Sequence, residues 1–143
     1  MIVVDANLLI YAIDADAPRH AAARRWLERI MSGPERVGLP WAVLLAFIRL
    51  TTRSTVFVRP IEPRVALDYV EAWLTLPNVE PVVPGPRHWT LLRELIDEAG
   101  TAANLTSDAH IAALAIEHGA TLHSADNDFK RFARLVHVNP LAT

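Results

Sequence analysis

The sequence predicts an α/β protein whose central, mostly parallel sheet is covered by helices on both faces. Two observations support this. Short apolar stretches of strand length alternate along the chain with longer stretches of helical periodicity, and this alternation is typical of a parallel sheet. The first strand, residues 2–4, is apolar without interruption, as expected of a strand buried on both faces. We therefore expect a three-layer α/β/α fold with four or five strands and residues 2–4 central.

The first half of the chain contains two of the predicted strands. The apolar run at residues 2–4 stops at Asp5, and Asn7 is a good N-cap for the helix that follows. The next elements are a helix between Pro18 and Gly33, a strand at 37–39 and a very apolar helix at 41–52.

The second half repeats the alternation. Pro81 lies within the strand predicted at 79–83, which indicates an edge position because proline cannot donate to the ladder. Thr106 or Ser107 is the predicted N-cap of the helix that runs to Gly119. The other elements are a loop at 53–63, a helix at 65–76, a helix from Trp89 to Gly100, and strands at 121–124 and 135–138.

Composition favours one globular domain, residues 1–143, with 52% hydrophobic residues. The absence of cysteine excludes disulfides and thiolate metal sites. No apolar run approaches the ~20 residues that span a bilayer, and no basic segment precedes an apolar one at the start, so we expect no membrane segment, no signal peptide and a cytosolic location. The net charge of −2 gives no overall indication of nucleic-acid binding.

Acidic side chains follow two of the predicted strands. Asp5 ends the strand at 2–4 and Asp126 follows the strand at 121–124, with Asp128 two residues later. If the two strands are parallel neighbours, these acids project at the same sheet edge, where α/β proteins bind ligands. Asp108 begins the preceding helix, where a favourable interaction with the helix dipole is an alternative explanation. Asp5 has a similar alternative as a helix cap.

Several carboxylates crowded at one edge would repel one another unless a cation bound them. Mg²⁺ and Mn²⁺ prefer oxygen ligands and keep several waters. Such a site activates water and holds a phosphate for in-line displacement.

With these motifs, the chain resembles the PIN-domain ribonucleases, and within them the VapC-type toxins of toxin–antitoxin pairs. The matching segments are IVVDANLLIYA and NLTSDAHIAALAIEHGATLHSADNDF, and the order of elements also agrees. The resemblance implies a PIN-like domain, endonucleolytic RNA cleavage with Mg²⁺ or Mn²⁺, a homodimer, and silencing by a VapB-type antitoxin. It makes Asp5, Asp108 and Asp126 the catalytic metal ligands, with Asp128 as a further ligand or an outer acid.

The chain departs from the family at one position. Many members carry a glutamate on the helix after the second strand, where this chain has Ala46, and no acid occurs between Pro40 and Pro60. Asp128 replaces that acid, or the site binds metal more weakly, or catalysis is lost. Because the other acids remain, we favour the first two explanations.

Other polar residues have weaker indications. Asn104 and Ser124 are candidates for orienting the carboxylates. The six histidines show no metal-binding spacing. His110 and His123 lie near the proposed site, but helix and strand packing explain them more simply. Candidate RNA-backbone contacts are Arg49, Arg53, Lys130 and Arg131.

Two other classes of function share features with this sequence. A PIN scaffold without activity would bind RNA or a protein partner and cleave nothing. A phosphotransferase with an aspartate nucleophile needs a second aspartate where Asn7 stands, and it needs a lysine, of which Lys130 is the only one. Dinucleotide binding is disfavoured because the five glycines never form GxGxxG.

Overall fold

The computed structural model describes residues 1–55 and 57–142 and contains a five-stranded parallel sheet. The strand order is β3-β2-β1-β4-β5, and every neighbouring pair is parallel. The strands are β1 (Ile2–Val4), β2 (Val37–Pro40), β3 (Val79–Val82), β4 (Thr121–His123) and β5 (His137–Val138). The predicted α/β/α class, the central position of β1 and the edge position of β3 are confirmed.

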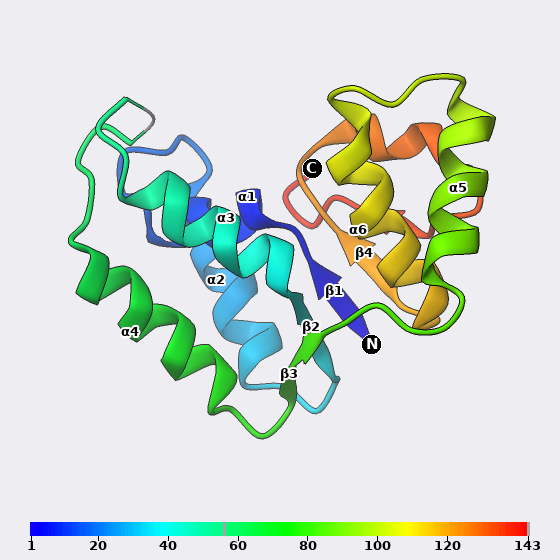
Figure 1. Cartoon of the computed structure of the whole chain (residues 1–143). Helices are drawn as coiled ribbons and strands as arrows, with labels where there is room; N and C mark the ends of the chain where they lie inside the picture. The colour runs from blue at the N-terminus through cyan, green and yellow to red at the C-terminus, as the bar shows by residue number, and fades with distance from the viewer. Residues whose placement is uncertain (56, 143) are drawn as a thin grey trace.

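The helices form two groups on opposite sides of the sheet (Figure 1). One group is α1 (Ala6–Ile13), α2 (His20–Met31), α3 (Trp41–Thr51) and α4 (Pro63–Leu74). The other is α5 (His88–Ala99) and α6 (Leu105–Glu117), and a 3₁₀ helix, η1 (Asn127–Arg131), precedes β5. The chain passes from the first group to the second after β3 and returns through β4 to the far side of β1. This reversal of winding direction beside β1 places the carboxyl ends of β1 and β4 at a ligand-binding edge.

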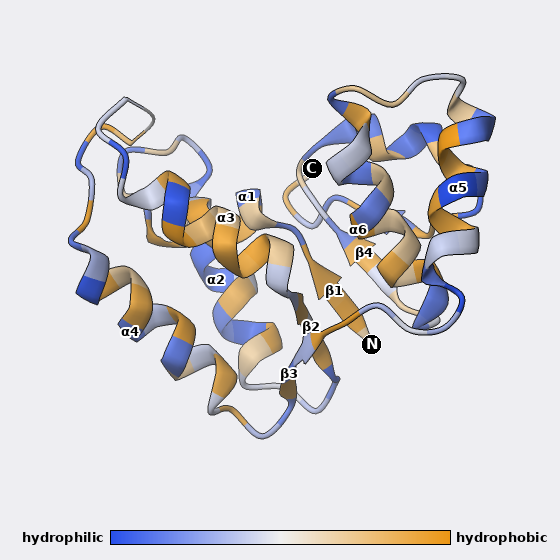
Figure 2. Cartoon of the chain, viewed as in Figure 1, coloured by the Kyte–Doolittle hydropathy of each residue, from blue (hydrophilic) through white to orange (hydrophobic). Residues whose placement is uncertain are grey.

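The core is formed by the strands and by the inward faces of the helices. Val3, Val4 and Leu122 are fully buried in the sheet, and Leu9 and Leu114 cover its two sides. Figure 2 shows hydrophobic residues along β1 and most of α3, whereas in α2 and α5 hydrophobic positions alternate with hydrophilic ones. In the described part of the chain, no helix is long and apolar enough to cross a membrane.

Two predicted helix starts are wrong. The N-cap of α1 is Asp5, whose Oδ1 accepts a hydrogen bond of 2.8 Å from the Ala6 amide, and Asn7 lies inside the helix. Helix α6 begins at Leu105 after Asn104, ahead of the predicted caps Thr106 and Ser107. Both errors arise because the cap is the residue at which the backbone turns into the helix, and several adjacent residues here have suitable side chains. The predicted loop at 53–63 includes residue 56, which lies outside the described residues; Pro63 already belongs to α4.

Candidate functional site

The candidate site lies where β1 and β4 end. The two strands pair in register, with Val4 opposite His123, and the Asp5 amide continues the ladder by donating to the His123 carbonyl over 3.0 Å. Asp5 and Ser124 are therefore the next residues at the same sheet edge. The condition on which the sequence prediction depended, that these two strands are parallel neighbours, is met.

Ser124 is the centre of a hydrogen-bond network at this edge. Its fully buried hydroxyl donates to Asp5 Oδ2 over 2.8 Å. The same oxygen accepts from the Asp126 amide at 3.0 Å and from Asn7 Nδ2 at 3.2 Å. Ser124 thus fixes the Asp5 carboxylate and the backbone at Asp126 relative to each other, and its role in orienting metal ligands stays a prediction.

Two of these carboxyl groups, Asp5 and Asp108, have raised pKa values. Burial raises the pKa of Asp5, and the negative charge of Asp126 adds to this, although hydrogen bonds from Ser124 and Ala6 oppose it. Burial also raises the pKa of Asp108 to about 6, with further contributions from Asp126, Asp5 and Asp128. Acids from three separate stretches of the chain therefore lie within electrostatic range of Asp108, an arrangement that favours a bound cation.

Asp126 and Asp128 belong to the turn after β4. Asp126 Oδ1 accepts from the Asp128 amide over 2.8 Å and so caps η1. Asp128 itself is exposed. Among the described residues, no group of three or more His, Asp or Glu side chains is close enough together to hold a metal ion. The donor set is nevertheless hard oxygen, which suits Mg²⁺ or Mn²⁺. The raised pKa values come first from burial and then from the neighbouring carboxylates, and a bound cation would offset both effects.

A cavity of about 520 Å³ opens beside Asp5 and Asp108, between α3 and α6. Ala46 of α3 lines it, so the position at which the resemblance leads us to expect a glutamate borders the same cavity as the two acids. Arg49 and His110 also line it. One wall therefore carries a positive charge, although α3 contributes no acid.

The other predicted residues differ in whether they lie near this cavity. Arg131 is close enough to Asp108 to lower its pKa, which agrees with a position near the site. Arg53 and Lys130 are exposed and do not line the cavity. Asn104 is exposed and makes no capping hydrogen bond to α6, so its orienting role stays a prediction.

Two residues of the site have contacts that the sequence does not predict. Asn7, predicted as a helix cap, reaches Ser124 with its side chain. His110, expected near the site but explained there by packing, lines the cavity and contacts His88. The available signal is helical spacing, since Ser107 and Thr106 precede His110 by three and four residues and so share its face of the helix.

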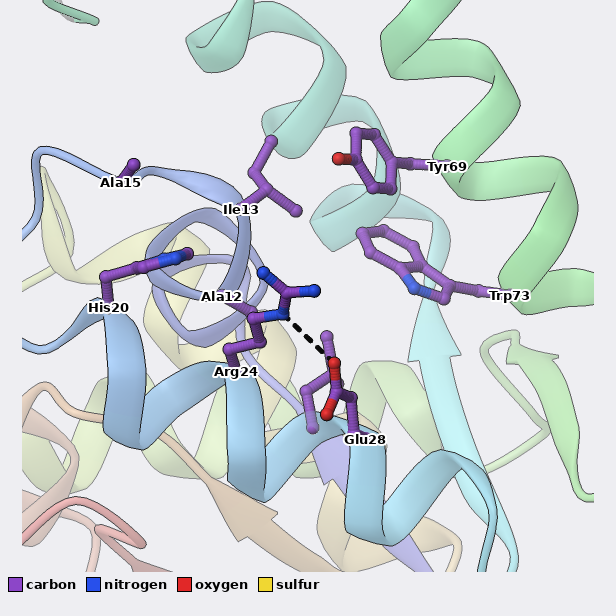
Figure 3. A pocket seen from close by; sticks show the side chains of 9 residues that line it. Ala12, Ile13, Ala15, His20, Arg24, Glu28, Tyr69 and Trp73 are labelled. Carbon is purple, nitrogen blue, oxygen red and sulfur yellow. Dashed lines mark hydrogen bonds and ion pairs between the residues drawn. The ribbon is translucent and has the colours of Figure 1, made fainter.

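A second cavity of about 360 Å³ lies between α1, α2 and α4. Figure 3 shows its aromatic wall of Tyr69 and Trp73 opposite Arg24, which pairs with Glu28 at 3.0 Å. None of the acids at the ends of β1 and β4 lines it. The chemistry expected of the carboxylates therefore belongs to the first cavity.

Comparison with known proteins gives one family. A model described as "PIN domain" matches residues 2–135. Ribonuclease VapC37 of Mycobacterium tuberculosis is 45% identical over 92% of both chains, and Ribonuclease VapC33 is 41% identical over 99% of both.

Solved structures agree in fold. VapBC2 from Rickettsia felis, bound to a promoter DNA fragment, has a TM-score of 0.71 at 20% identity over 97% of this chain and 98% of its own. VapC20 of Mycobacterium tuberculosis, described as a Sarcin-Ricin loop cleaving toxin, has a TM-score of 0.62 at 22% identity over 91% and 93%.

Proposed function

Because this chain belongs to the PIN-domain family and groups with its VapC ribonucleases, we propose that it is an endoribonuclease and the toxin of a toxin–antitoxin pair. The main structural support is that acids from three distant stretches of the chain come together: Asp126 and Asp5 both contribute to the raised pKa of Asp108, and Ser124 joins the Asp5 carboxylate to the Asp126 backbone. A protein that acts on RNA would work in the cytosol, as expected from the sequence.

The proposed reaction is hydrolysis of an RNA phosphodiester bond. Asp5, Asp108 and Asp126 would hold Mg²⁺ or Mn²⁺, with Asp128 as an outer or fourth acid. When bound, the ion supplies an activated water and a counter-charge for the phosphate. Ser124 keeps Asp5 oriented, and Arg49 and Arg131 supply positive charge for the RNA backbone.

The experiment compares metal-dependent cleavage of RNA by wild type and Asp5→Asn. Replacement by Asn keeps the shape of the side chain but removes its charge, so we expect cleavage to fall at least hundredfold with the fold intact. Asp68→Asn, an exposed acid on α4, is the matched control. Full activity in Asp5→Asn would contradict the catalytic assignment.

A second candidate is a PIN scaffold that binds RNA or protein without cleaving. The observation in its favour is Ala46, which faces the cavity where the family glutamate would stand. RNA binding by purified wild type without cleavage in Mg²⁺ or Mn²⁺ would support this alternative over the nuclease.

We also propose two protein partners. Several solved neighbours are toxin–antitoxin assemblies, among them VapBC-1 of nontypeable Haemophilus influenzae, and by analogy a VapB-type antitoxin would bind and silence this chain. The second partner is another copy of the chain in a homodimer. Inhibition of cleavage by the small protein encoded beside this one is the test of the first partner.

A further inference from the structure

Two histidines join α5 and α6 beside the acidic cavity. His88 Nε2 and His110 Nδ1 lie 2.9 Å apart, so one of them donates a hydrogen bond to the other. The rings meet edge to face, with centroids 4.7 Å apart and an interplanar angle of 79°. His88 is buried at the start of α5, whereas His110 is half-buried and lines the cavity.

The burial of His88 decides which ring donates. Its Nδ1 is buried and has no hydrogen-bond partner among the described residues. If His110 Nδ1 were the donor, neutral His88 would carry its proton on this buried nitrogen and leave an N–H unpaired. If His88 Nε2 is the donor, only a lone pair is left unpaired. Buried N–H groups without a partner are the rarer case in proteins, which favours His88 as donor.

This tautomer leaves His110 with its proton on Nε2, the nitrogen that does not contact His88. Thr106 and Ser107 line the cavity from the same helix as His110, and Arg49 lines it from α3. A phosphate that approaches Asp5 and Asp108 is repelled by their charges. Hydrogen-bond donors on the walls of the cavity offset this repulsion. His110 lines the cavity and His88 holds its ring in place, so its Nε2–H is a candidate for such a donor.

We propose that His110 contacts the substrate, with its Nε2–H donating to a non-bridging phosphate oxygen of the bound RNA. His88 is the positioning residue, because it fixes the tautomer and the orientation of the His110 ring. This inference rests on the proposed function for its ligand, RNA, but the tautomer and the binding of phosphate can be measured without any cleavage.

The first test is NMR of the ¹⁵N-labelled histidines of the wild type in Mg²⁺, with inorganic phosphate as the probe. We expect His110 to be protonated on Nε2 and its Nε2 signal to shift as phosphate is added. His118, at the far end of α6, is the reference and should not shift. A proton on His110 Nδ1, or an Nε2 signal that phosphate leaves unchanged, would overturn the proposal.

The second test is steady-state RNA cleavage by substituted proteins. His110→Phe removes the donor and keeps the ring size, so kcat/KM should fall about tenfold to hundredfold. His110→Gln restores an N–H donor and should recover most of the loss, which a merely structural role would not predict. His88→Phe should give a smaller loss, and His118→Phe none.

Cleavage by His110→Phe at the wild-type rate, or equal losses in the Phe and Gln variants, would refute the contact. If His110→Phe does not fold, the Gln variant and the NMR test still decide. A wild type that cleaves no RNA contradicts the proposed function alone, because the phosphate test needs no cleavage.

Discussion

Asp108 is the residue at which burial, together with the neighbouring acids, has the clearest consequence for stability. Its pKa in the folded protein is about 6, against an ordinary value of 3.8. The folded state therefore binds the proton more tightly than the unfolded chain, and stability falls as the pH rises from about 4 to 6. Without metal, Asp108→Asn should raise the unfolding temperature at pH 7 and change it little below pH 4.

The gain at pH 7 should be about 1 kcal/mol, because solvent screens a half-exposed group. Thermal unfolding in a chelator between pH 3.5 and 7.5 measures it, and Asp68→Asn serves as the control. A variant less stable than wild type at neutral pH would show that the carboxylates do not repel one another in the folded state.

Ala46 tests whether the departure from the family pattern weakens the site. Its side chain faces the cavity that also contains Asp5 and Asp108. A glutamate there would add an oxygen ligand, so Ala46→Glu should tighten Mn²⁺ binding about tenfold by calorimetry. The matched control is Ala46→Gln, which has the same length without the charge. Equal affinities in the two variants would exclude this position from metal binding.

Asp128 is exposed, and its effect on the pKa of Asp108 is smaller than those of Asp126 and Asp5. We therefore expect Asp128→Asn to lower RNA cleavage about tenfold, well short of the loss in Asp5→Asn. Parallel cleavage assays of the two variants measure the difference. A loss as large as that of Asp5→Asn would make Asp128 a direct ligand that replaces the absent glutamate.

The sequence allowed part of this site to be predicted. Asp5 and Asp126 follow apolar strands, and parallel pairing brings strand ends together. The position of Asp108 depends on the loop before α6, where Gly100 has a φ of 74° and Ala103 a φ of 44°, and no local pattern foretells such a path. The contacts of His110 were not predicted because only the three-dimensional structure brings α6 alongside α3 to form a cavity.

At the scale of elements, hydrophobic periodicity predicted the helices and strands within a few residues, since each buries one face. Tertiary hydrogen bonds are less visible in a sequence. The clearest is made by Glu117, the last residue of α6, whose Oε1 and Oε2 accept from the amides of Gly85 and Arg87, each at 2.8 Å. This carboxylate therefore holds the turn before α5 against the end of α6.

The contact between Glu117 and Gly85 predicts non-additive substitutions. A Cβ at Gly85 would lie 2.5 Å from Glu117 Oε2, so Gly85→Ala displaces the carboxylate from its two amides. Glu117→Ala should cost about 1–3 kcal/mol for the same lost bonds. The double variant should then be clearly less destabilised than the sum of the two, as chemical denaturation would measure. Additive losses would show that the contact contributes nothing, and Glu71→Ala on α4 is the control.

The pH dependence of this contact follows from the same geometry. Burial acts to raise the pKa of Glu117, but the hydrogen bonds from Gly85 and Arg87 outweigh it and lower this pKa below its ordinary 4.5. Its stabilising effect is present above pH 4.5 and is lost as the pH falls through the lower folded value. The stability difference between wild type and Glu117→Gln should therefore shrink on acidification.

At the scale of the whole molecule, the distribution of apolar surface predicts self-association. Large apolar side chains are exposed on α3 and α5, two of the helices that contribute residues to the lining of the acidic cavity: Leu45 of α3 is 59% exposed and Trp89 of α5 is 68% exposed. Trp41, at the start of α3, is 48% exposed. A stable homodimer buries roughly 1,200–2,000 Å² in total or more, a modest share of the 7888 Å² surface of each chain.

We expect light scattering to find a dimer at micromolar concentration. Leu45→Glu and Trp89→Glu should each shift it toward monomer, because a buried interface does not tolerate an unpaired charge. Val58→Glu is the matched control, since Val58 is 78% exposed in the loop between α3 and α4. If the wild type is monomeric, or if Val58→Glu dissociates the dimer as strongly as the other two, the proposed interface is wrong. Leu45 also lines the cavity beside Asp5 and Asp108, so we expect dissociation of the dimer to lower RNA cleavage as well. Cleavage measured across a range of protein concentrations would relate assembly to activity.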